Sequence, residues 1–315
     1  MRKIVNREHI EGILFQHDLE LKTVQNETSA NYGKEFIAGN VEIAVDEEGL
    51  NVIPVHFTYV TETTGKGNSN PTFTVLKQII SGELSSVMSG GVDTSARLRI
   101  DTAIGLNEFY TDRNGKEELV SAKRNEGGFV HVTPTLSADE KQRDTFECDM
   151  LITNVRVIDA DEEKNLPAKA IIKGAIFDFR KSLLPVEFSA TNPNAMNYFE
   201  SLGASSKEPV FTRVKGHQVS ETIVRKIEEE SAFGEPSVRE VTSNRKDWVI
   251  TWAQGNPYDW DDESTITAAE LTEAMANREI YLADVKKRQD EYNASKNQNA
   301  IPSADAGVSK KDFKF

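Results

Sequence analysis

The sequence has little with which to cross-link a fold covalently or to cross a membrane. It contains one cysteine, Cys148, so no intrachain disulfide can form, and this is typical of proteins in a reducing compartment. No run approaches the roughly 20 apolar residues that a membrane-spanning helix needs. The N-terminus becomes charged too quickly for the apolar core of a signal peptide. We therefore expect a cytoplasmic protein that does not bind a membrane.

The sequence also lacks the motifs of the common catalytic sites. It has no phosphate-binding Gly-x-x-x-x-Gly-Lys loop, no Gly-x-Gly-x-x-Gly after a strand and no Gly-x-Ser-x-Gly elbow. The five histidines are scattered, without the spacing of a zinc site. Cys148 lies in an apolar stretch, where a buried and inert thiol is expected. We predict that the protein is not an enzyme and uses no metal or cofactor.

The charge balance is strongly acidic, with a formal net charge of −14. A protein that holds duplex DNA by bulk attraction is usually basic, so this charge argues against a polybasic binding mode. The excess lies mainly in four acidic runs at 46–48, 159–163, 228–230 and 259–263, and the rest of the chain is close to balanced. A local basic groove on an acidic molecule is compatible with this distribution.

Hydrophobic periodicity predicts a β-rich α+β protein. Alternating patterns predict strands at 36–45, 52–60, 96–100, 105–110, 118–122, 127–132, 146–157, 170–179, 184–188, 209–215, 237–241 and 248–252. The Asn114-Gly115 pair predicts a tight hairpin turn between the strands at 105–110 and 118–122. Helical spacing predicts short helices at 72–81 and 192–202. A third helix begins at the Thr267–Glu270 capping box and runs to about residue 293. We expect an N-terminal segment (1–34), a β-rich core (35–255), an acidic loop with the C-terminal helix (256–294) and a disordered tail (295–315). No internal repeat is visible.

Several predicted strands place rings and cations on one face, because residues i, i+2 and i+4 of a strand share a face. An exposed ring stacks on an unpaired base while a nearby cation attracts phosphate, so this pattern favours single-stranded nucleic acid. Each set also has a structural interpretation, as core rings or as ordinary solvent-facing cations. The candidate nucleic-acid-binding residues are Arg97, Arg99, Phe177, Phe179, Arg180, Lys181, Phe211, Arg213, Lys215, Arg245, Lys246, Trp248 and Trp252.

Residues 174–179, 193–200, 209–216, 232–238 and 248–252 resemble a group of proteins from the replication modules of phages of Gram-positive bacteria. The resemblance covers residues 36–293 and implies single-stranded DNA binding by an OB-like core, in the host cytoplasm. Bacterial and phage single-stranded DNA-binding proteins commonly end in an acidic tail tipped by Phe that docks replication or recombination proteins. Phe313 and Phe315 match that tip, but Lys310, Lys311 and Lys314 make it basic.

The sequence therefore predicts an OB-like five-stranded barrel with extra strands, short helices and a C-terminal helix. The predicted function is non-catalytic binding and protection of single-stranded DNA during phage DNA replication or recombination. Two alternatives fit the acidic, hairpin-rich sequence: a phage virion or assembly component, and an acidic module that inhibits a host enzyme by mimicking nucleic acid. The sequence leaves homo-oligomerisation open.

Overall fold

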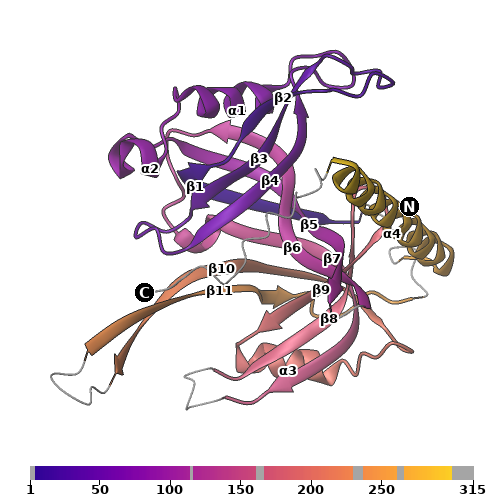
Figure 1. Cartoon of the computed structure of the whole chain (residues 1–315). Helices are drawn as coiled ribbons and strands as arrows, with labels where there is room; N and C mark the ends of the chain where they lie inside the picture. The colour runs from indigo at the N-terminus through magenta and orange to yellow at the C-terminus, as the bar shows by residue number, and fades with distance from the viewer. Residues whose placement is uncertain (1–3, 114–115, 161–166, 230–236, 261–265, 300–315) are drawn as a thin grey trace, which may run out of the picture.

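The strands of the first half of the chain pair in a closed cycle (Figure 1). The computed structural model describes residues 4–113, 116–160, 167–229, 237–260 and 266–299, with the backbone alone at 220–229, 237–245 and 295–299. The first cycle runs β1 (Asn6–His17), β3 (Glu35–Ala44), β4 (Val52–Thr61), β6 (Lys116–Val132), β5 (Arg97–Arg113) and back to β1. A short parallel pairing of Val55 with Asn125 closes it, and β2 (Glu20–Thr23) lies beside β3.

The second half repeats this arrangement. The cycle runs β7 (Asp144–Ile158), β8 (Lys169–Phe177), β9 (Leu183–Ala190), β11 (Ser237–Ala253), β10 (Val210–Glu229) and back to β7. One parallel bridge, between Val249 and Ser189, links β11 to β9. β1 pairs antiparallel with both β5 and β7, so it joins the N-terminal unit (β1–β6) to the C-terminal unit (β7–β11) in a single eleven-stranded sheet.

The helices occupy equivalent places in the two units. α1 (Pro71–Ser81) lies between β4 and β5, and α3 (Pro193–Ser201) lies between β9 and β10. α2 (Val87–Gly90) and two short 3-10 turns (Val92–Thr94 and Glu140–Gln142) fill connections. The two units thus share one order of strands and helix, a duplication that the sequence does not reveal.

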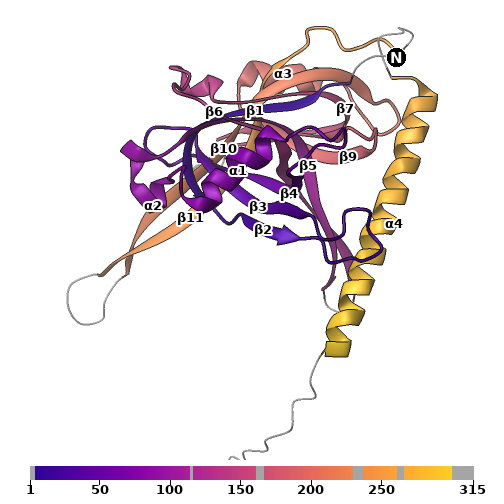
Figure 2. The same cartoon turned by 90° about the horizontal axis from the view of Figure 1, so that it is seen from above.

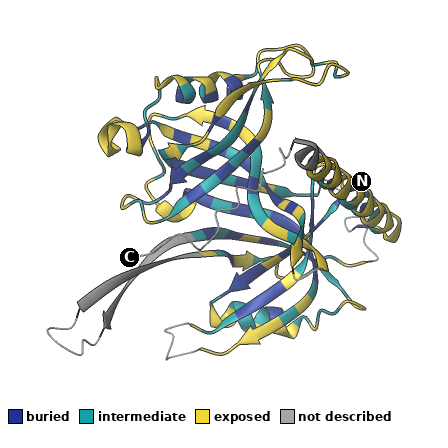
Figure 3. Ribbon diagram, viewed as in Figure 1, coloured by how far each residue is buried: buried dark blue, intermediate teal, exposed yellow. Residues whose placement is uncertain are grey.

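Each unit has its own hydrophobic core, and Figure 3 shows two separate buried interiors. In β5, Leu98 and Ile100 point into the N-terminal core while Arg97 and Arg99 point to solvent. In β7, Phe146, Cys148 and Met150 point into the C-terminal core. The period-2 alternation along these strands is what fixes which face is buried.

α4 (Ala268–Asn299) runs along one side of the molecule (Figure 2). The predicted capping box forms, since Glu270 N–H donates to Thr267 Oγ1 (3.2 Å) and Thr267 N–H donates to Glu270 Oε2 (3.0 Å). Arg278 donates to the buried carboxylate of Glu108 on β5. The helix ends later than the predicted residue 293. Within the described residues, no helix is both long and apolar enough to span a membrane.

Two expectations about strands differ from the structure. Residues 1–34 were set apart from the β-rich core, whereas β1 lies at the centre of the sheet. The two strands expected at 237–241 and 248–252 form the single strand β11, because the polar residues 243–247 stay extended through backbone pairing with β10. The predicted hairpin after β5 is confirmed by the pairing of Arg113 with Lys116, while Asn114 and Gly115 lie outside the described residues.

Candidate nucleic-acid interface

One face of the sheet, turned away from both cores, carries rings, cations and carboxylates from six adjacent strands. Side chains directly opposite each other in antiparallel strands share a face. His9 on β1 is opposite Asp101 on β5 and Thr145 on β7, and Asp101 is opposite Phe129 on β6. The outer face, as we name it, comprises Arg7, His9, Glu11, Arg97, Arg99, Asp101, Phe129, His131, Glu147, Asp149, Arg213, Lys215 and Trp252.

One row of this outer face crosses four strands. Arg7 is opposite Glu147, Glu147 is opposite Lys215, and Lys215 is opposite Trp252. Arg7 Nε donates to Glu147 Oε2 (3.0 Å), and Lys215 Nζ lies 4.9 Å from the centroid of the Trp252 ring. Partial burial acts to raise the pKa of Glu147, but the hydrogen bond from Arg7 and the charges of Lys215 and Arg213 lower that pKa overall. The row places an exposed indole beside a cation.

Arg213 is held by a buried carboxylate. Its guanidinium donates two hydrogen bonds to Asp149, Nε to Oδ1 (2.8 Å) and Nη2 to Oδ2 (3.0 Å), and Asp149 is fully buried. The hydrogen bonds to Asp149 raise the pKa of Arg213. The charge of Arg213 is therefore balanced by Asp149 and Glu147, and its donors are mostly used within the fold.

The outer face is more open at its β5 and β6 end. Arg97 and Arg99 are exposed, and Arg99 Nε lies 3.7 Å from Asp101 Oδ2. Phe129, next to them on β6, is 69% exposed, and His131 is opposite Arg99. This combination offers a free ring and two guanidinium groups to a ligand.

The sequence identified five residues of this surface: Arg97, Arg99, Arg213, Lys215 and Trp252. It missed Arg7 and His9, because residues 1–34 were not predicted to form a strand. It also missed Phe129 and His131, although they alternate along the predicted strand 127–132 and that alternation was the available signal.

Three predicted stacking rings are buried, and for these the prediction was wrong. Phe177 and Phe211 are packed edge-to-face with centroids 6.2 Å apart, under the segment that contains Tyr258. Trp248 lies in the C-terminal core, and its ring centroid is 5.6 Å from that of Phe146. Trp248 and Trp252 were expected to share a face. The pairing skips Thr251 at a β-bulge, and this extra residue turns Trp252 to the opposite face.

The remaining predicted residues lie elsewhere. Phe179, Arg180 and Lys181 are exposed in the turn between β8 and β9, with the Arg180 guanidinium 5.1 Å from the Phe179 ring centroid. Lys246 is exposed on β11, on the side of Trp248. The side chain of Arg245 and the whole of Phe313 and Phe315 lie outside the described residues.

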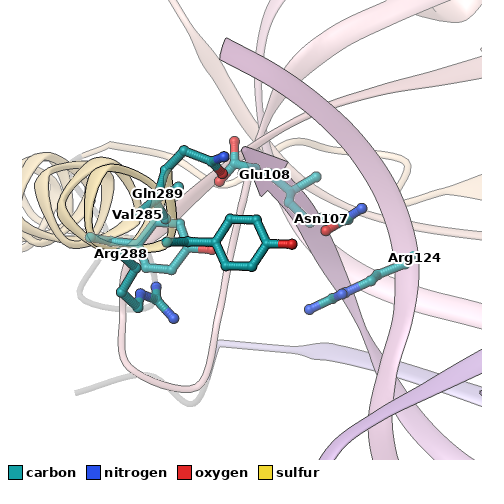
Figure 4. A pocket seen from close by; sticks show the side chains of 9 residues that line it. Asn107, Glu108, Arg124, Val285, Arg288 and Gln289 are labelled. Atoms are coloured by element: carbon teal, nitrogen blue, oxygen red, sulfur yellow. The ribbon is translucent and has the colours of Figure 1, made fainter. Parts of the chain in front are cut away.

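A separate cavity of about 260 Å³ lies between α4 and the strands β5 and β6 (Figure 4). Arg124 on β6 and Arg288 on α4 reach it from opposite sides, beside Glu108 and Asn107. Among the residues that the structure describes, no three His, Cys, Asp or Glu side chains are grouped to hold a metal ion. Cys148 is buried as predicted, and burial raises the pKa of its thiol.

Comparison with known proteins places the chain in a family. The family model described as YorF matches residues 5–288. The chain belongs to the YorF family. No curated protein matches this YorF-family sequence. Among solved structures, it is similar to the wild-type single-stranded DNA binding protein from Thermus aquaticus and to a deletion mutant of that protein. Each is 10% identical with a TM-score of 0.44. The wild-type match covers 85% of this chain and 99% of that chain, and the mutant match covers 84% and 100%. A TM-score of 0.44 is too low to establish a shared fold.

Proposed function

We propose that this YorF-family protein binds single-stranded DNA along the outer face, without catalysis. The observation that carries the proposal is the pairing of exposed rings with cations on one continuous surface of an acidic molecule. Phe129 and Trp252, 69% and 46% exposed, lie on strands at the two ends of that surface. The outer face has five Arg and Lys side chains against four carboxylates, whereas the whole chain has 37 against 51.

The chemistry of an unpaired strand fits this surface. Each stacked base contributes roughly 1–3 kcal/mol whatever its identity, and cations between the rings attract the phosphates. The outer face spans five strand spacings of about 4.8 Å each, or roughly 24 Å. That width accommodates several nucleotides. Duplex DNA hides its base faces, so the exposed rings favour single strands.

The strand cycles support the same proposal. We infer that both units are OB-like barrels, because each contains a closed cycle of five strands in one order, with a short helix between the third and fourth strands of the cycle. OB-folds bind oligonucleotides on the face of their second and third strands and on flanking loops. The outer face is instead built from the first, fourth and fifth strands of each cycle, so the OB-like order supports the class of ligand and not its position. The sequence resemblance to phage replication-module proteins supports a role in protecting single-stranded DNA during phage replication or recombination. A tail ending in Phe315 would then dock partner proteins.

A titration with labelled oligo-dT at two ionic strengths tests the proposal. An oligonucleotide of about 16 nucleotides reaches the upper end of site sizes known for one OB-fold. We expect binding that weakens as salt rises, with a slope of log K against log salt of about −0.7 for each phosphate contacted. Absence of binding, or affinity that does not change with salt, would refute the proposal.

A further inference from the structure

A second cationic surface lies on the opposite side of β11 from Trp252. It is a cavity of about 420 Å³ between the two units, lined by Lys123 and Arg124 of β6, Lys169 of β8 and Lys246 of β11. We name it the lysine cavity. Glu187 and Asp247 are the two carboxylates among its lining residues, so four cations face two acids. This excess of positive charge is unusual on a chain with a net charge of −14.

Several of these charges are already balanced within the fold. Lys169 Nζ is 3.2 Å from Asp247 Oδ2, and Arg124 Nη2 is 2.6 Å from Glu126 Oε1. Glu187 also pairs with Lys173, at 3.0 Å. The two acids that line the lysine cavity are therefore engaged by Lys169 and Lys173.

Lys123 and Lys246 are in a different position. No carboxylate oxygen of the described residues lies within 4 Å of either ammonium group. Lys123 donates to the backbone carbonyl of Glu187, and its Nζ lies 4.9 Å from the ring centroid of Phe188 and 5.5 Å from that of Trp248. Burial lowers the pKa of Lys123 to about 8, although the charges of Asp247 and Glu187 oppose this shift. A desolvated ammonium in this setting is stabilised by an anion that enters the lysine cavity.

The amide side chains beside the cations are held in place. Gln218 Nε2 donates to Glu8 Oε1 (2.6 Å) and Asn125 Nδ2 donates to the carbonyl of Pro54 (2.8 Å). These bonds connect β10, β1, β6 and β4 beneath the lysine cavity. The cavity is thus formed by elements of both units that are fixed to each other before any ligand enters.

We propose that the lysine cavity binds a phosphate group, held by Lys123 and Lys246, at a site separate from the outer face. A phosphate offers three acceptor oxygens to cations that approach from different strands, whereas a carboxylate offers two. The volume lies within the range of small-ligand sites, roughly 300–1,000 Å³, so a mononucleotide fits as well as inorganic phosphate. The phosphate comes from a free ligand or from a nucleic-acid strand, and the test separates these sources.

The test is calorimetric titration of the full chain with inorganic phosphate, thymidine monophosphate, thymidine and oligo-dT. Lys123→Gln and Lys246→Gln should each weaken phosphate binding by about tenfold or more, the usual effect of losing a hydrogen bond to a charged group. Lys287→Gln is the matched control, because Lys287 is exposed on α4 outside the lysine cavity. Lys123→Met keeps the side-chain length without the charge, and thermal melting confirms that each variant folds.

Binding of phosphate and thymidine monophosphate but not thymidine, with loss only in the Lys123 and Lys246 variants, supports a free-ligand site. If the Lys123 and Lys246 variants lose affinity for oligo-dT but for none of the other probes, the site is assigned to strand phosphates. If no phosphate probe shows binding that depends on Lys123 or Lys246, the proposal is overturned. The proposed binding of DNA to the outer face can be tested separately whatever the result at the lysine cavity, because Trp252 does not line that cavity.

Discussion

The variant Trp252→Ala tests whether the Trp252 ring binds DNA or only stabilises the fold. Trp252 is 46% exposed, and its described ring contact is with Lys215. An exposed cation–π contact contributes about 0.5–1 kcal/mol, so Trp252→Ala should lower the free energy of unfolding by no more than about 1 kcal/mol. If one base stacks on this ring, DNA binding loses about 1–3 kcal/mol, which is roughly a 5- to 150-fold loss of affinity.

Trp248→Ala is the matched control, because it removes the same side chain four residues earlier in the same strand. Trp248 is 7% exposed and packs against Phe146 and Phe188. Its removal should lower the free energy of unfolding by roughly 3–5 kcal/mol, as for other buried aromatic residues. Trp252→Phe keeps a stacking ring and should retain most of the affinity.

The assay is fluorescence anisotropy of a labelled oligo-dT, with denaturant unfolding of each variant alongside. We expect Trp252→Ala to be stable and weak in binding, and Trp248→Ala to be unstable. If Trp252→Ala binds oligo-dT as well as the wild-type protein, the outer face is not the binding surface at that end.

Three further predictions concern stability. Arg213→Ala removes the guanidinium from buried Asp149 and should lower the free energy of unfolding by roughly 3–5 kcal/mol in denaturant titration; a change below about 1 kcal/mol would contradict the structural role of this pair. Burial raises the pKa of Asp144 from 3.8 to about 8, so its protonated form favours the fold, and the contribution of Asp144 to stability should be largest below about pH 4 and decline as pH rises from about 4 through 8. Asp144→Asn should flatten that decline in pH-dependent melting, and an unchanged slope would count against it. Thr267→Ala removes the capping contact with Glu270 and should cost about 1 kcal/mol by thermal melting, whereas Thr267→Ser should be neutral.

Local patterning predicted the element types well, because it depends on neighbours along the chain. The capping box at Thr267, the helix at residues 72–81 and the hairpin after residue 113 all depend on local signals, and all three form. Leu98 and Ile100 alternate with Arg97 and Arg99, and this alternation correctly placed both arginines in solvent.

The failures have long-range causes. Phe211 and Arg213 share a strand face, but Phe211 is covered by residues more than 40 positions away, including Tyr258. The bulge at Thr251 reverses the face of Trp252, and only the partner strand β10 defines that bulge. The lysine cavity combines residues of β6, β8 and β11 that are far apart in sequence, so no local motif marks it. The duplication of the two units is likewise visible only in the strand pairings.

The central claim is that bases stack on the outer face, and photo-crosslinking tests it most directly. An oligonucleotide carrying iododeoxyuridine is bound, irradiated and digested, and the modified peptides are identified by mass spectrometry. We predict crosslinks at Phe129 and Trp252. Exposed aromatic residues elsewhere, such as Tyr32 in the connection between β2 and β3, should stay unmodified. Crosslinks confined to Tyr32 or Tyr59, with none at Phe129 or Trp252, would contradict the account.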